Sequence, residues 1–200
     1  ADIVPTSQKN PREMWSCIKR VIDSVKNKKL QKLLVLIYKT NQKKLLIHPA
    51  SIKFNHNYRS GLLEHTYNMI NIAKRIYHIY DVDYDLTIAG LLLVKIGALD
   101  GISSGYEFER TKQGNLLGIG TLGREILLNT ARRISKFPDH LLIKLEHIIL
   151  SSQDFDESKN KRTAAFPEAI FVQFIASIDK NMNLMETFLH NDQNTGEFTN

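Results

Sequence analysis

Hydrophobic residues recur at intervals of three and four along most of the chain, which is the spacing of one face of an α-helix. This pattern predicts helices over residues 11–25, 29–39, 43–48, 60–80, 84–96, 122–135, 139–151 and 167–190. The segment 84–96 is almost continuously apolar, so we expect it to be a fully buried central helix. Strand patterns are few, and the fold class is therefore predicted to be all-α.

The remaining segments predict the organisation of one domain, which suits a chain of 200 residues. Residues 1–10 are predicted to be an extended lead-in, 11–190 the domain, and 191–200 a flexible polar tail. The glycine-rich region 97–114 predicts a loop or small hairpin, and 153–165 a solvated loop. Trp15, Tyr77 and Tyr80 have helical spacing and are predicted to lie in the core.

Basic residues are concentrated in the first third of the chain. Residues 1–60 hold 13 Lys and Arg against 3 Asp and Glu, whereas residues 61–200 hold 14 against 18. A concentrated basic region attracts polyanions such as RNA. Lysines that merely solvate the outer faces of helices give the same pattern, so both interpretations stay open.

Cysteine content and hydropathy indicate the compartment. Cys17 is the single cysteine, which excludes an internal disulfide and favours a reducing, cytoplasmic location. No run of about 18 apolar residues is present, so no membrane span is expected. The first residues lack the basic and apolar segments of a signal peptide.

Several ordered sequence blocks resemble a known family. GLLEH at 61–65 is followed by QGNLLG at 113–118, LEHIILSS at 145–152 and IDKNMN at 178–183. Together they resemble the HD domain of YhaM-type 3′–5′ exoribonucleases, over roughly residues 4–188. The resemblance implies an HD-domain-like helical bundle. It also implies that an oligonucleotide-binding domain precedes this segment in a longer protein.

The same resemblance implies a metal site with altered residues. HD domains hold one or two divalent metals between histidines and aspartates, and the metals activate water to attack a phosphoester. Matched by position, His65 and His147 are the retained histidines. The positions where the family has a ligand and this chain has another residue are Val94, Lys95, Ile119, Ser152, Gln153 and Ala176.

The altered positions predict that the metals are not held. Val94 and Lys95 replace the paired His and Asp, while Asp179 lies one turn beyond Ala176. Two imidazoles without a carboxylate suit magnesium or manganese poorly, and the Lys95 ammonium repels a cation. We therefore expect no cofactor, no bound metal and no intact catalytic residue. A zinc site completed by His56 or Asp179 is an alternative.

Lys95 has two interpretations of its own, because an ammonium in an apolar segment needs an anion or a route to solvent. In the first, Lys95 replaces the charge of the metal and holds a phosphate of a nucleotide or nucleic acid. In the second, it forms a structural salt bridge to Asp179 or Glu64. Further candidates for binding an anion at the predicted cleft mouth are His56, Arg59 and Lys53.

These observations favour a catalytically degenerate HD domain that binds RNA, another nucleic acid or a protein within a larger protein or assembly. The first alternative is an active, metal-dependent 3′–5′ exoribonuclease or phosphodiesterase with a rearranged metal site. The second is a purely structural domain that mediates oligomerisation, either with copies of itself or with another protein.

Overall fold

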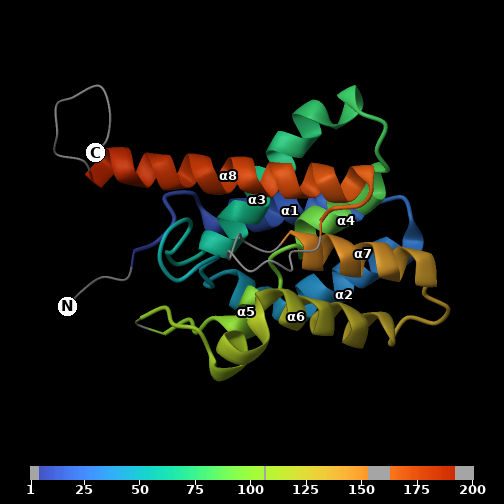
Figure 1. Ribbon diagram of the computed structural model, residues 1–200, viewed down its shortest axis with the longest axis horizontal. Helices are drawn as coiled ribbons and strands as arrows, with labels where there is room; N and C mark the ends of the chain where they lie inside the picture. The colour runs from blue at the N-terminus through green and yellow to red at the C-terminus, as the bar shows by residue number, and fades with distance from the viewer. Residues whose placement is uncertain (1–4, 106, 153–162, 192–200) are drawn as a thin grey trace.

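The computed structural model describes residues 5–105, 107–152 and 163–191, which form a bundle of helices (Figure 1). Within these residues β pairing is limited to two isolated bridges, Thr6 with Arg59 and Ile102 with Arg110. The all-α, HD-domain-like prediction is confirmed. The helices are α1 (Pro11–Ser24), α2 (Lys28–Leu45), α3 (Gly61–Ile76), the 3₁₀ turn η1 (Tyr77–Ile79), α4 (Tyr84–Leu93), α5 (Ala98–Gly101), α6 (Lys112–Ala131), α7 (Asp139–Ser151) and α8 (Pro167–Asn191).

Helix α4 is the central helix, as its apolar sequence predicts. Residues 86–93 are all buried, and α4 packs against α2, α3, α7 and α8. The helix nevertheless ends at Leu93, so Val94 and Lys95 lie in the turn between α4 and α5 and not within the helix. A close approach accompanies this turn, because a Cβ on Gly97 would lie 2.0 Å from the carbonyl oxygen of Ile119.

Two regions depart most from the predicted helix boundaries. Residues 28–45 form one continuous helix, since no glycine or proline interrupts them and Asn41 donates to the Ile37 carbonyl oxygen inside the helix, at 2.8 Å. Helix α6 begins at Lys112, ten residues before the predicted start. Thr111 caps it by accepting from the Gly114 amide, and Gly118, with φ of 77°, introduces a kink. The block QGNLLG therefore lies in the first turns of α6.

Residues 5–7 of the predicted lead-in pair with Arg59, in the segment just before α3. Arg59 donates its amide to the Pro5 carbonyl oxygen at 2.8 Å, and the Ser7 amide donates to the Arg59 carbonyl oxygen at 2.9 Å. At the other end, α8 continues to Asn191. The predicted tail beyond that residue, and residues 153–162 of the predicted loop, lie outside the described residues.

The aromatic residues predicted to be core divide into two groups. Trp15 and Tyr77 pack against the core, and Trp15 contacts the ring of Tyr38. Tyr80 was predicted wrongly, because it is exposed beside Phe171. Tyr80 follows η1, where the chain leaves the helical face that buries Tyr77. Among the described helices, none has both the length and the apolar composition that a membrane span requires.

Candidate functional site

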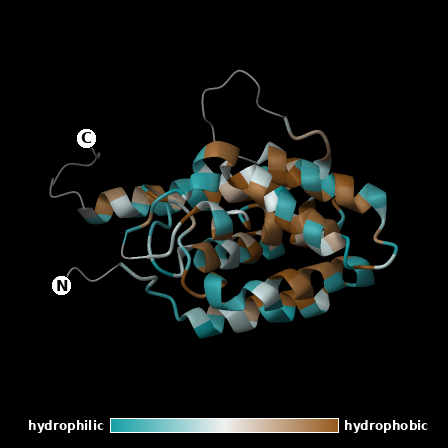
Figure 2. Ribbon diagram, turned by 90° about the horizontal axis from the view of Figure 1, so that it is seen from below, coloured by the Kyte–Doolittle hydropathy of each residue, from teal (hydrophilic) through white to brown (hydrophobic). Residues whose placement is uncertain are grey.

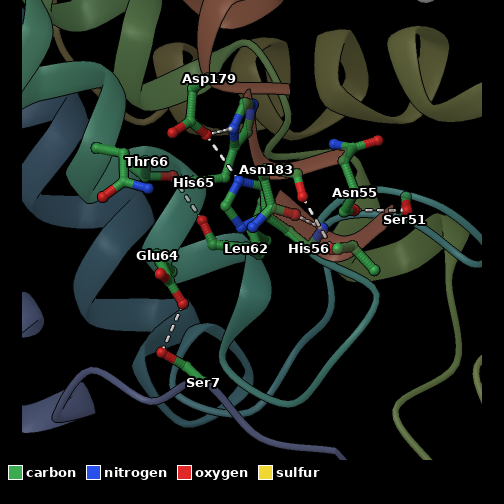
Figure 3. Close-up of polar contacts among 12 residues, drawn as sticks. Ser7, Ser51, Asn55, His56, Leu62, Glu64, His65, Thr66, Asp179 and Asn183 are labelled. Atoms are coloured by element: carbon green, nitrogen blue, oxygen red, sulfur yellow. Dashed lines mark hydrogen bonds and ion pairs between the residues drawn. The ribbon is translucent and has the colours of Figure 1, made fainter. Parts of the chain in front are cut away.

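Three residues that are distant in sequence meet at one buried point. His56 precedes α3, His65 lies on α3 and Asp179 lies on α8, so the packing of α3 against α8 brings them together (Figure 3). One carboxylate oxygen, Asp179 Oδ2, lies 2.7 Å from His56 Nε2 and 2.6 Å from His65 Nδ1. All three side chains are buried, and one nitrogen or oxygen atom from each lies within 4.8 Å of those from the other two.

The charge state of this cluster follows from its burial and hydrogen bonds. Burial acts to raise the pKa of Asp179, but the bonds from His56 and His65 outweigh it and hold that pKa well below its usual range. Burial lowers the pKa of His65, and the nearby carboxylate only partly opposes this. Asp179 is therefore ionised and accepts from both rings, while His65 is neutral and donates from Nδ1.

Hydrogen bonds to its backbone and to both ring nitrogens hold His56 in place. Its φ of 49° is unusual for a residue with a side chain, and surrounding bonds fix it. The His56 amide donates to Asn183 Oδ1 at 2.7 Å, and its carbonyl oxygen accepts from the Ala50 amide at 3.0 Å. Its second ring nitrogen lies 2.8 Å from the Tyr58 hydroxyl, which in turn lies 3.2 Å from Asn183 Nδ2. Both ring nitrogens of His56 are thus used within the fold.

His65 keeps one nitrogen without a partner. Its Nε2 atom is buried and has no hydrogen-bond partner among the described residues. The bond from Nδ1 to Asp179 fixes the ring orientation, as carboxylates do behind histidines that bind metals. His65 Nε2 is therefore the nitrogen of this cluster that is positioned to contact a ligand.

The second retained histidine lies elsewhere. His147, on α7, accepts from the Ala165 amide through Nε2 at 3.1 Å and contacts the ring of Phe166. It is not part of the group formed by His65 and Asp179. The structure instead joins His65 to the two residues that the sequence offered as completing a zinc site, His56 and Asp179.

The described residues at the other positions matched to family ligands are not grouped as metal ligands. Val94 and Ala176 are buried hydrocarbons, and Ile119 lines a cleft described below. Ser152 is buried, and its hydroxyl has no hydrogen-bond partner among the described residues. Gln153 lies outside those residues.

Lys95 is buried to 8% exposure and lines the same cleft as Ile119. Lys95 has an interaction partner of its own, and the two carboxylates offered as its salt-bridge partners accept from other groups as well. Asp179 is bound by the histidines. Glu64 accepts from Lys9 Nζ at 2.8 Å and from the Ser7 hydroxyl at 2.6 Å. Burial acts to raise the pKa of Glu64, but these bonds hold it below its ordinary value.

A cleft of about 630 Å³ opens beside Lys95. Among the described residues that line it are four cationic side chains and no carboxylate, and the cations are Lys53, Lys95, Arg110 and Lys180. The exposed ring of Phe54 lies at the same cleft, with 61% of its surface accessible. Walls of low dielectric lined by one sign of charge concentrate a positive potential, which attracts anions.

Only part of this cleft was predicted. Of the four anion-binding candidates, Lys53 and Lys95 line it, whereas His56 is enclosed in the buried network and Arg59 does not line it. Arg110 and Lys180 were missed. The bridge between Ile102 and Arg110 and the packing of α8 bring them to the cleft, and no local pattern indicates either contact.

Comparison with known proteins agrees with the predicted resemblance. The chain is 30% identical over 199 residues to the 3′–5′ exoribonuclease YhaM of Bacillus subtilis, covering 99% of this chain and 63% of that protein. It is 31% identical over 201 residues to YhaM of Halalkalibacterium halodurans, covering 100% and 62%, respectively. The chain thus spans less than two thirds of the length of these relatives. No family model and no solved structure matches it.

Proposed function

We propose that this chain is a catalytically degenerate HD domain that binds RNA in the cleft beside Lys95 without hydrolysing it, as part of a longer protein. The observation that carries this proposal is the charge of the cleft. Four cations and no carboxylate line it among the described residues, and Lys95 stands where the family has the aspartate of its paired ligands. The similarity to 3′–5′ exoribonucleases supports RNA as the polyanion.

The chemistry of the donors argues against a catalytic dication. Asp179 Oδ2 already accepts two short hydrogen bonds, and both ring nitrogens of His56 are engaged. His65 Nε2 is the remaining buried nitrogen of that cluster, and Lys95 contributes a coulombic effect that lowers the pKa of His65. Magnesium and manganese prefer several oxygen ligands, which this arrangement does not offer. The described residues therefore do not fit the family's metals.

A fixed ammonium supports binding and not hydrolysis. Lys95 supplies positive charge to a phosphate oxygen, but it has no vacant coordination position with which to acidify water. Lys53 and Arg110 are exposed at the same cleft and add attraction for neighbouring phosphates. Phe54 offers an exposed ring on which a base can stack, an interaction of about 1–3 kcal/mol.

Fluorescence anisotropy with a short, unstructured RNA in EDTA tests this proposal. The wild-type chain is expected to bind, with affinity falling steeply between about 50 and 200 mM salt. Lys53→Gln and Arg110→Gln should each weaken binding and reduce the slope against log salt by about 0.7. Lys74→Gln removes an exposed lysine of α3 that does not line the cleft, and it should leave binding unchanged. Absence of binding at moderate salt, or equal losses in all three variants, would contradict the proposal.

An active metal-dependent phosphodiesterase is the second candidate. The proximity of His56, His65 and Asp179 favours it, as does the activity in the names of the relatives. The test is hydrolysis of the same RNA in manganese, with stoichiometric metal measured on the purified protein. Activity that is abolished by His65→Ala would establish this candidate and overturn the proposal of a degenerate site.

A further inference from the structure

Helix α8 carries a second apolar surface that faces away from the core. It consists of seven large side chains that are 43–63% exposed: Ile170, Phe174, Ile178, Met182, Met185, Phe188 and Leu189. On a helix with 3.6 residues per turn they fall within a sector of about 120°, as wide as the stripe that usually faces a core. The far end of α8 extends beyond the other helices (Figure 1), and apolar residues recur along it (Figure 2). We call this set of seven residues the α8 stripe.

We infer that the α8 stripe is the interface of a symmetric dimer, in which α8 of a second copy packs antiparallel against it. The stripe is close to palindromic about its midpoint. Antiparallel pairing about that point places Ile170 opposite Leu189, Phe174 opposite Met185, and Ile178 opposite Met182. A two-fold contact requires such a self-complementary surface.

Charge placement also fits a second copy. Within the range of the stripe, α8 carries Asp179, Lys180 and Glu186, and the spacing of the helix puts all three outside the apolar sector. The chain has a net charge of +6, which disfavours self-association through most surfaces. A contact centred on the α8 stripe brings no like charges together at its centre.

The exposed apolar area of the stripe is close to what a stable interface needs. With roughly 100 Å² left on each partly exposed side chain, the seven supply on the order of 700 Å² to each partner. Stable interfaces bury about 800 Å² per partner. Ile79 and Tyr80 are 63% and 59% exposed, and the Tyr80 ring contacts Phe171 on α8, so these two residues extend the surface. A patch of this size lies at or above the upper end of the largest apolar patches on monomeric proteins, which often mark interaction sites.

The dimer would leave the cleft accessible, because Lys180 projects from a different side of α8 than the stripe. Failure of the dimer and failure of RNA binding are therefore separable. The interface variants are expected to keep RNA binding, and the cleft variants to keep the dimer.

Sedimentation equilibrium of the full 200-residue chain tests this inference, with Phe174→Glu, Met182→Glu and Ile143→Glu compared with wild type. Wild type is expected to be dimeric at micromolar concentration. The two stripe variants should dissociate at least tenfold more readily, while Ile143→Glu, an exposed apolar residue of α7, should remain dimeric. Circular dichroism should show wild-type helicity for all variants, since every substituted side chain is exposed.

A monomeric wild type would overturn the inference and leave the stripe to another partner. Stripe variants that remain as dimeric as wild type would also overturn it, because the contact would then lie elsewhere. Loss of the dimer in Ile143→Glu to the same extent as in the stripe variants would show that the effect is not specific to α8.

Discussion

The buried network around Asp179 and the cleft around Lys95 both contain charged groups, but the two regions differ in what surrounds those groups. In the network, an ionised carboxylate accepts from two histidines, and Tyr58 and Asn183 complete the hydrogen bonds of His56. In the cleft, cations from four separate segments face one hollow, with no carboxylate among the described lining residues. The network is built to hold α3 against α8, and the cleft is suited to an outside anion.

Under the proposed function, this difference would correspond to the conversion of a metal site into a binding site. His65, at the position matched to the family's first ligand, is oriented by Asp179. Lys95 would place an ammonium, which attracts an anion, where the family has a carboxylate that attracts a cation. The predictions below separate the structural role of the network from the binding role of the cleft.

The largest effect is expected from Asp179→Ala. Removing the carboxylate leaves two buried ring N–H groups without an acceptor, and breaking a buried pair in this way costs about 3–5 kcal/mol. Urea unfolding should show this loss. Asp100→Ala is the matched control, because Asp100 pairs with Lys44 at a largely exposed site and its loss should cost less than about 1 kcal/mol. Equal losses would show that the network does not stabilise the fold.

Gly97→Ala should have the next largest effect. The new Cβ would lie 2.0 Å from the Ile119 carbonyl oxygen and 2.4 Å from the Gly123 amide nitrogen, so the cleft wall would have to move. We expect a loss of about 3 kcal/mol in unfolding free energy. Gly118→Ala meets no atom within 4 Å but must adopt φ of 77° with ψ of 156°, a region that is almost confined to glycine, which should cost about 1–3 kcal/mol. Thermal denaturation measures both losses, and a larger loss of stability in Gly118→Ala than in Gly97→Ala would contradict this expectation.

Restoring the family's histidine and aspartate at positions 94 and 95 should weaken RNA binding and strengthen manganese binding. Val94→His combined with Lys95→Asp replaces the ammonium with a ligand pair beside His65. RNA affinity in EDTA should fall about tenfold, or 1.4 kcal/mol, while manganese affinity should rise. Calorimetric titration with manganese and anisotropy with RNA would measure both. Unchanged RNA affinity in a folded double variant would remove Lys95 from the binding site.

The smallest effect is expected from pH. The pKa of buried His65 lies below its ordinary value of 6.5, and that of His48 is lowered by burial too, so the unfolded chain takes up protons that the folded chain does not. Stability should therefore decrease as pH falls below about 6.5. Asp179, whose pKa is depressed, adds a further loss below about pH 4. Urea unfolding at a series of pH values should show both steps, with the first reduced in His65→Gln; stability that increases on acidification would contradict this assignment.

The sequence predicted the helical architecture well but predicted only part of the site. The apolar run 84–96 and the apolar spacing over 139–151 are local signals, and helices α4 and α7 follow them. The break predicted within α2 was wrong because polar residues such as Asn41 can continue a helix through bonds to their own backbone. Arg110 and Lys180 reach the cleft through contacts between distant segments, which periodicity does not encode.

The contact of His56 with Asp179 illustrates the same limit. These residues are 123 positions apart, and the short bond between them depends on how α8 crosses the start of α3. Residue types alone offered both as zinc ligands. In the structure, the ring nitrogen of His56 and the carboxylate oxygen of Asp179 bond to each other.

The most direct test of the central claim is one RNA titration carried out first in EDTA and then in manganese, with the length of the RNA checked after each. Binding by Lys95 and its neighbouring cations predicts the same affinity in both conditions and an intact RNA. Binding that requires manganese, or RNA that is shortened from its 3′ end when manganese is added, would contradict the account.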